Sequence, residues 1–173
     1  MNGFYAQFYK LKQKQMKTHE LVTFLKGIRV ETDKYFSVMG SMMPSREIAV
    51  AITAAQNAKM WLGQVLKTLD QPNPYPDSKN AANTKIEPTA DVYSGNIDSV
   101  LQGLSHIQQV KMLRQKLTAS YEGLEEKQEE LQANSELDGI GYHATVKAWE
   151  YLVESNMWLG MELGRINSET KKD

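Results

Sequence analysis

Apolar residues recur every three or four positions along most of this chain, and this spacing constrains its fold class more than any other feature. Near the N-terminus they form two groups: Phe4, Phe8 and Leu11, then Leu21, Leu25 and Ile28. Residues at such intervals share one face of an α-helix, so the pattern predicts an amphipathic helix over about residues 4–29. No segment shows the sustained apolar–polar alternation of a half-buried strand. We therefore expect an all-α fold without a sheet.

Three further helices are predicted from the same spacing. A polar, methionine-rich connection leads to the second helix, over about residues 44–69. The third helix begins at a cap supplied by Asn96 or Asp98, and its apolar stripe from Ile97 to Leu131 is spaced as in a coiled-coil seam. After a turn rich in glycine and polar residues, the fourth helix covers about residues 142–167. The chain therefore contains four main helices.

Prolines divide these helices into two pairs. Four of the five prolines lie between residues 72 and 88, and the fifth, Pro44, suits the first turn of the second helix. The prediction is two tandem antiparallel helical hairpins joined by a Pro-rich loop. The first hairpin comprises residues 1–70, the connecting loop residues 71–96, and the second, diverged hairpin residues 97–173.

An internal repeat supports this division. The tetrapeptide Met-Trp-Leu-Gly occurs at residues 60–63 and again at 157–160, a shift of 97. In the preceding helices we align the two copies at a shift of 100, which pairs Lys14 with Arg114, Gln15 with Gln115 and Thr18 with Thr118. The pattern indicates duplication of one hairpin. Glycine inside a helix costs ~1 kcal/mol relative to alanine, so we expect close helix approach there, and both tryptophans in the core.

Charge is unevenly distributed, although the formal net charge is only −1. Residues 1–69 hold ten Lys or Arg and four Asp or Glu, whereas residues 70–173 hold ten basic and seventeen acidic residues. The basic half could attract a phosphorylated ligand. The alternatives are a solvated polar face, or two halves that attract each other in an oligomer. Cysteine is absent, and no apolar run approaches the ~20 residues that cross a bilayer. We expect a cytoplasmic protein that does not bind membranes.

Groups that would support catalysis or metal binding are not arranged in a recognisable pattern. His19, His106 and His143 lie on different predicted elements without the spacing of a metal site. The acidic run at residues 122–130 is typical of a solvated helix face. The sequence also has no Gly-rich phosphate loop and no evident nucleophile with its base. We therefore predict no enzymatic activity, no cofactor and no metal.

One polar stripe could bind a ligand. Arg46, Thr53, Asn57 and Met60 follow one another at seven, four and three residues, which places them along one side of the second helix. Arginine offers a planar fork for phosphate, and Thr and Asn can hydrogen-bond a base or ribose edge. The alternative is an ordinary exposed helix face.

The segment that contains this stripe resembles a known phage pattern. Residues 45–62 run Ser-Arg-Glu, then Ala-x-Thr, then a Met-Trp pair, and the motifs at residues 73–76 and 86–91 resemble an extension often attached to it. The pattern is that of the hairpin domain shared by the phage anti-CBASS and anti-Thoeris sponges. Those proteins are small, helical and oligomeric, and they sequester cyclic nucleotide signals of bacterial immune systems without cutting them. The resemblance covers roughly residues 18–91.

The resemblance implies a phage anti-defence protein of the host cytosol. Its partners would be a cyclic nucleotide second messenger, either a cyclic oligonucleotide or a cyclic ADP-ribose isomer, and further copies of the chain in a homo-oligomer. The candidate ligand-binding residues are Arg46, Thr53, Asn57, Lys14, Lys17 and Tyr75. The first two match the family pattern, and the third shares their helix side. The two lysines are suggested by charge, and the tyrosine could stack on a base.

The second copy departs from this pattern. At the shift of 97, Arg46 corresponds to His143 and Thr53 to Glu150, whose carboxylate would repel a phosphate. We therefore predict one ligand-binding hairpin and a second hairpin that is either a structural copy or binds a different ligand. The alternative function is a helical protein–protein interaction or scaffold protein, suggested by the coiled-coil-like stripe from Ile97 to Leu131. Binding to a nucleic acid polymer is not expected, because the second half of the chain is acidic.

Overall fold

The protein is all-α, as expected. The computed structural model describes residues 2–69, 103–133 and 139–170, with side chains from residue 19 onward, and that part of the chain contains no strand. Its helices are α1 (Asn2–Ser41), α2 (Arg46–Thr68), α4 (His106–Glu126), α5 (Gln128–Ala133) and α6 (Gly139–Glu169). None of the helices in the described ranges is both long enough and apolar enough to cross a membrane.

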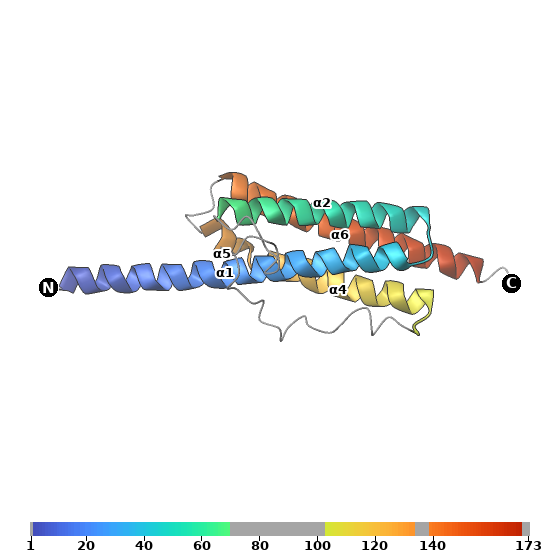
Figure 1. Cartoon of the computed structure of the whole chain (residues 1–173), viewed down its shortest axis with the longest axis horizontal. Coiled ribbons are helices and arrows are strands. Elements are labelled where there is room, and N and C mark those ends of the chain that lie inside the picture. Colours follow the sequence, from blue (N-terminus) through green and yellow to red (C-terminus); the bar gives the residue numbers. More distant parts are fainter. Residues whose placement is uncertain (1, 70–102, 134–138, 171–173) are drawn as a thin grey trace, which may run out of the picture.

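The four long helices lie side by side in an antiparallel bundle (Figure 1). α2 packs against α1 on one side and α6 on the other, and α4 packs against α6. α1 and α4 complete the bundle but approach each other less closely than the other neighbours do. α2 and α4 run in the same direction, so the chain leaves α2 at one end of the bundle and enters α4 at the other (Figure 1). The first part of α1 extends beyond the bundle.

The closest pair, α2 and α6, owes its packing to small residues. Ala51 and Ala58 of α2, and Ala148 of α6, are fully buried and carry only a methyl group. Across the contact, the Ser155 hydroxyl of α6 donates a hydrogen bond of 2.9 Å to the backbone carbonyl of Ala51. Because small side chains let helix axes approach closely, this pair forms the centre of the bundle.

Large apolar side chains from all four long helices fill a single core. The most deeply buried of these include Leu25, Ile28 and Tyr35 of α1, Leu62 and Leu66 of α2, Leu113 and Leu117 of α4, and Leu152 and Leu159 of α6. Leu131 of α5 joins the same core. Both tryptophans of the repeated tetrapeptide are half-buried and pack against this core, as predicted.

The predicted end of the first helix is wrong, because α1 continues to Ser41 through the supposed methionine-rich connection. The buried stripe explains the extra length. Beyond residue 28, Thr32, Tyr35 and Met39 are fully buried and continue the spacing of three and four residues. A threonine inside the stripe hid this continuity from the apolar pattern. Its hydroxyl donates to the backbone carbonyl of Ile28 at 2.7 Å, which satisfies it within the core.

Two helix starts also differ from the prediction. α2 begins at Arg46 because the Ser45 side chain caps it, so Pro44 precedes the helix and is not part of its first turn. α4 begins at His106 behind a capping box formed by Ser105 and Gln108. Residues 103–105 are not helical, so no helix runs unbroken from residue 97 to 131. The predicted caps at residues 96 and 98 lie outside the described residues.

Burial follows the same register in the two halves of the bundle. At a shift of 97, buried positions of α2 fall on buried positions of α6: 48 on 145, 51 on 148, 55 on 152, 58 on 155, 62 on 159 and 66 on 163. Between α1 and α4 the register that aligns burial is 85: 25 falls on 110, 28 on 113, 32 on 117, 35 on 120 and 39 on 124. The predicted shift of 100 for this pair is therefore wrong.

The physical reason is the length of the connection within each half. Three residues and a cap separate α1 from α2, whereas residues 127–138, which include α5, separate α4 from α6. Because the connection is longer in the second half, the shift from α1 to α4 is smaller than the shift from α2 to α6. The predicted shift of 100 would have required the connection between α4 and α6 to be shorter than the one between α1 and α2.

Candidate functional site

The polar stripe predicted on the second helix lies on the outward side of α2. Arg46 and Thr53 are exposed, Asn57 is half-buried, and Met60 is 58% exposed. The Thr53 hydroxyl donates to the Ala49 carbonyl at 3.1 Å, which leaves its oxygen able to accept from a ligand. No carboxylate of the described residues forms an ion pair with Arg46. Its charge is thus available to an anion.

Helix geometry sets the size of anything that contacts the whole stripe. With a rise of about 1.5 Å per residue, Arg46 and Thr53 lie about 10 Å apart along α2, and Arg46 and Asn57 about 16 Å. One phosphate group cannot reach both ends. The stripe is also part of the outer surface of the bundle, so a ligand here would need a second wall.

The remaining predicted ligand residues cannot be placed beside this stripe. Lys14 and Lys17 belong to the part of α1 whose side chains lie outside the described residues, although their backbone is helical. Tyr75 lies outside the described residues altogether. Their proposed roles stay predictions.

The matching positions of α6 have different surroundings. His143, which corresponds to Arg46, makes a T-shaped ring contact with Trp61 of α2, with ring centroids 6.0 Å apart and planes at 87°. Glu150, which corresponds to Thr53, forms an ion pair with Lys147 at 2.6 Å. The second copy thus presents an ion pair and an aromatic contact where the first presents an unneutralised arginine.

A second set of polar residues, which sequence reasoning missed, lies between α1 and α2. Arg29 of α1 donates from Nε to the backbone carbonyl of Lys59 at 3.2 Å. The Lys59 ammonium forms an ion pair with Asp33 and lies 5.1 Å from the centre of the Phe36 ring. The guanidinium sits against Gly63, where an added Cβ would be 3.2 Å from Arg29 Cζ. We name these five residues the Arg29 cluster.

The corresponding residues between α4 and α6 form the Arg114 cluster. Arg114 donates from Nε to Asn156 Oδ1 at 3.3 Å. The Asn156 amide donates in turn to Thr118 Oγ1 at 3.1 Å and to the Tyr121 hydroxyl at 3.4 Å. The guanidinium lies over Gly160, whose added Cβ would be 3.4 Å from Arg114 Cζ.

The two clusters correspond position by position. At the shifts of 85 and 97, Arg29 matches Arg114, Asp33 matches Thr118, Phe36 matches Tyr121, Lys59 matches Asn156, and Gly63 matches Gly160. The glycine of the repeated tetrapeptide therefore makes room for an arginine from the neighbouring helix, not for a helix backbone. The shift of 100 concealed this match. Aligning the apolar stripe around Leu25 and Ile28 with that around Val110 and Leu113 would have revealed it.

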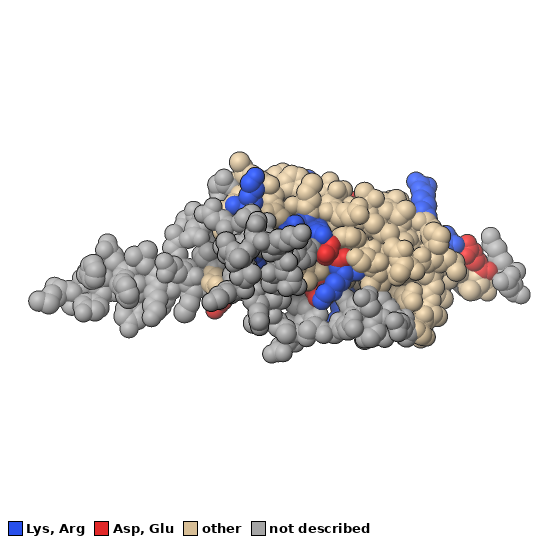
Figure 2. Space-filling model, viewed as in Figure 1, with Lys and Arg blue, Asp and Glu red and all other residues tan. Residues whose placement is uncertain are grey.

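Charge is the main difference between the clusters. The Arg29 cluster contains its own carboxylate and a second cation, whereas the Arg114 cluster replaces them with a hydroxyl and an amide. An open groove of about 450 Å³ lies beside Arg114, lined by Lys111, Arg114, Gln115, Thr118, Ala119 and Glu122 of α4 and by Leu163 of α6. In the view of Figure 2, Lys and Arg side chains lie next to Asp and Glu side chains near the centre of the molecule, with uncharged residues above and to the right of them.

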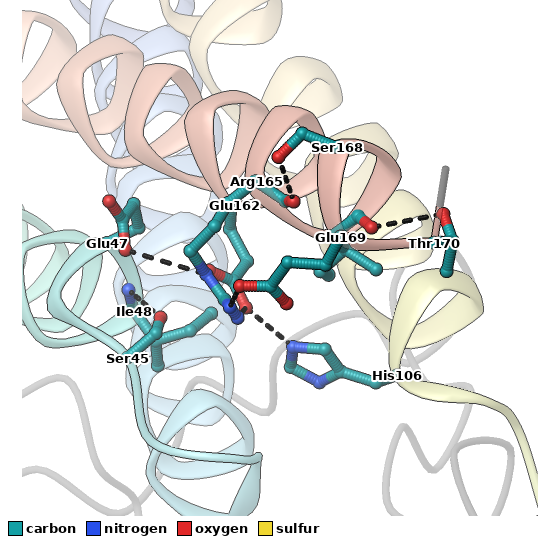
Figure 3. Close-up of polar contacts among 10 residues, drawn as sticks. Ser45, Glu47, Ile48, His106, Glu162, Arg165, Ser168, Glu169 and Thr170 are labelled. Atoms are coloured by element: carbon teal, nitrogen blue, oxygen red, sulfur yellow. Dashed lines mark hydrogen bonds and ion pairs between the residues drawn. The ribbon is translucent and has the colours of Figure 1, made fainter. Parts of the chain in front are cut away.

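A third polar cluster holds one end of the bundle together (Figure 3). The carboxylate of Glu162 in α6 is fully buried and accepts from Arg165 Nε at 2.9 Å and Nη2 at 2.8 Å. His106 Nε2, at the start of α4, lies 2.7 Å from Glu162 Oε1. Glu47, in the first turn of α2, lies 3.9 Å from Arg165. The cluster thereby joins the ends of three helices.

These contacts stabilise the ionised form of Glu162. The hydrogen bonds from Arg165 lower its pKa most, those from His106 and Ser45 add to the effect, and together they outweigh the opposing effect of burial. The pKa of Glu162 falls from 4.5 to about 2. Both oxygens already have donors, so we interpret the cluster as structural, not as a catalytic acid or base.

Comparison with protein-family models, with curated proteins and with solved structures finds no match to this chain.

Proposed function

We propose that the protein captures a cyclic nucleotide signal without cleaving it, as a phage anti-defence sponge of the anti-CBASS or anti-Thoeris type. The observation that carries the proposal is Arg46, an exposed guanidinium without an ion-pair partner in the described part of the chain. It lies on the same outward side of α2 as Thr53 and Asn57. The resemblance of residues 45–62 to the sponge hairpin domain connects this stripe with nucleotide capture.

The chemistry of the stripe suits a cyclic nucleotide. Arg46 would bind a phosphate through two parallel N–H···O bonds, and Thr53 and Asn57 would hydrogen-bond a base or ribose edge. Their spacing of about 10 to 16 Å along α2 requires a ligand with separated polar groups. Cyclic oligonucleotides and cyclic ADP-ribose isomers both have several phosphates and bases. An inorganic phosphate would use only one end of the stripe.

A sponge must also enclose its ligand, and one face of α2 does not. We propose that a second copy of the chain supplies the other wall, in a homo-oligomer in the bacterial cytosol. Met60, which is 58% exposed on the same stripe, would be covered there. Lys14, Lys17 and Tyr75 are the further residues proposed to complete the site.

The test begins with the protein purified from infected cells. Denaturation should release a nucleotide that mass spectrometry identifies as cyclic and intact. A thermal-shift panel of cyclic dinucleotides, cyclic trinucleotides and cyclic ADP-ribose isomers should then give a large increase in melting temperature with at least one of them, because tight binding stabilises the folded state by several kcal/mol at excess ligand.

Two variants make the test specific. Arg46→Ala should abolish the shift, whereas Lys67→Ala should not, because Lys67 is also exposed on α2 and its removal changes net charge equally. Absence of any shift at micromolar ligand would contradict the proposal for the compounds tested, as would a shift that Arg46→Ala retains. Recovery of a cleaved product would contradict capture without cleavage.

The alternative function is a protein–protein interaction. The coiled-coil-like stripe that suggested it is largely used within the chain itself, since Val110, Leu113, Leu117 and Leu124 are buried in the core. A different observation favours it: Met60, Met157 and Met161 are each at least 49% exposed on α2 and α6. A single stoichiometric protein partner from infected cells, bound equally by the Arg46→Ala variant, would support this function.

A further inference from the structure

We propose that the groove beside Arg114 binds an organic phosphate of about mononucleotide size. This site is separate from the α2 stripe and does not depend on the function proposed for it. It assigns a ligand-binding role to the second half of the chain, for which the sequence pattern left open a structural copy or a hairpin with a different ligand.

The cation of the site is Arg114 itself. Its Nε is engaged by Asn156, but its two Nη nitrogens, which carry four N–H donors, have no acceptor or carboxylate among the described residues. The guanidinium is half-buried and held over Gly160, so it is fixed before a ligand arrives. Lys111, three residues earlier on the groove-lining face of α4, adds a second, exposed cation. Together they form an anion site with little reorganisation required.

The Arg29 cluster in the first half shows why only the Arg114 cluster can accept an anionic ligand. There Asp33 and Lys59 form an ion pair beside Arg29, so a carboxylate already lies where an anionic ligand would bind. In the second half Thr118 takes the place of that aspartate. Its hydroxyl donates to the Tyr121 hydroxyl at 3.3 Å and accepts from Asn156, so this position adds no negative charge beside Arg114. At the next position Ala119 stands where the first half has Lys34. A methyl group leaves space that a lysine side chain would use.

The lining of the groove defines the kind of phosphate. Its volume of about 450 Å³ is within the range of small-molecule sites, which is about 300–1,000 Å³. Leu163 and Ala119 supply apolar surface for the body of the ligand. Glu122 lies about 12 Å along α4 from Arg114, where it would repel a second phosphate but accept a hydrogen bond from a hydroxyl or amino group. A monophosphate ester with a hydrogen-bond donor at its other end fits this polarity.

The experiment titrates the full-length protein with adenosine 5′-monophosphate, inorganic phosphate and adenosine at low salt, using isothermal titration calorimetry. We expect one site per chain for the monophosphate, weaker binding of inorganic phosphate, and still weaker binding of adenosine. Arg114→Gln should weaken monophosphate binding about tenfold or more, because charge-assisted hydrogen bonds to phosphate are lost. Arg46→Ala should leave it unchanged, which separates this site from the α2 stripe.

A second variant blocks the groove without removing the arginine. Thr118→Asp combined with Asn156→Lys installs the ion pair of the Arg29 cluster, an arrangement that the first half already accommodates. We expect this double variant to keep its melting temperature within a few degrees and to lose monophosphate binding. Arg29→Gln, the symmetric control, should retain it.

Three results would overturn the proposal. The first is an absence of monophosphate binding by the wild-type protein at millimolar ligand. The second is unchanged affinity in a folded Arg114→Gln or blocked variant. The third is equal loss in Arg29→Gln, which would place the binding site in the first half.

Discussion

Replacing Glu162 with glutamine tests the polar cluster at the end of the bundle. Glutamine keeps the shape of the carboxyl group and resembles its protonated form, but it cannot carry the charge that Arg165 and His106 contact. The pKa of Glu162 falls from 4.5 to about 2 on folding, chiefly because of its hydrogen bonds from Arg165. A shift of this size corresponds to roughly 3 kcal/mol of folding free energy, because one pKa unit is about 1.4 kcal/mol.

The sign of the pH dependence follows from the lowered pKa. A carboxyl group whose folded pKa lies below its unfolded pKa stabilises the protein fully above the unfolded value, near pH 4.5. That contribution is lost as the pH falls from there towards 2. At pH 7 we therefore expect Glu162→Gln to be less stable than wild type by about 3 kcal/mol, a large part of the ~5–15 kcal/mol typical of a domain. The difference between the two proteins should narrow towards zero near pH 2.

Urea denaturation at pH 7, 5, 4, 3 and 2 measures both proteins, and their difference removes the contribution of the other carboxylates. Glu169→Gln is the matched control, since Glu169 accepts from the same arginine at 2.7 Å but its side chain is 61% exposed. The control should cost under about 1 kcal/mol at every pH. Parallel stability curves for wild type and Glu162→Gln would refute the assignment of the charge to this buried carboxylate.

Three further predictions concern packing, each measured by urea denaturation at neutral pH. Gly160→Ala should stabilise the protein by up to about 1 kcal/mol, because the added methyl group lies at an ordinary contact distance of 3.4 Å from Arg114. Gly63→Ala should stabilise it less, because the added methyl group would lie 3.2 Å from Arg29, which must move. The reverse order of the two variants would contradict the arginine–glycine packing. Tyr35→Phe should cost about 1 kcal/mol, since the buried hydroxyl bonds a serine and a backbone carbonyl of α4, and a neutral effect would argue against that bridge. Leu159→Ala should cost about 2–5 kcal/mol, while Met157→Ala, on an exposed side chain two residues away, should cost under about 0.5 kcal/mol; equal costs would contradict the orientation of α6.

The apolar spacing predicted the fold class and most of the second and fourth helices, because a 3.6-residue repeat records which side of a helix is buried. It failed at the end of α1, where Thr32 interrupts the apolar stripe. The threonine is nevertheless fully buried, since its hydroxyl bonds within its own helix. It also failed at the start of α4, which the capping box at Ser105 fixes. Local hydrogen bonds of this kind leave little trace in an apolar pattern.

The sequence likewise indicated some of the residues of the candidate sites and missed others. Periodicity correctly placed Arg46 and Thr53 on one side of the second helix, because both belong to one helix; the structure shows that this side of α2 faces outward. It could not show the Arg29 and Arg114 clusters, because each cluster combines residues of two helices. The buried Glu162 was not recognised either, although the repeat aligns it with the apolar Val65 of the first copy.

The sequence by itself determined that the chain forms amphipathic helices, which side of each is buried, and that one tetrapeptide recurs. Those properties depend on the spacing of residues along a single helix. Only the tertiary structure decided that α2 and α6 form the central pair, that the register between α1 and α4 is 85 residues, and that each repeated glycine faces an arginine. A hydrophobic stripe can pack against any other apolar surface, because the hydrophobic effect is not directional. The partner and the register are set by the small residues, the connection lengths and the polar groups that must be satisfied together.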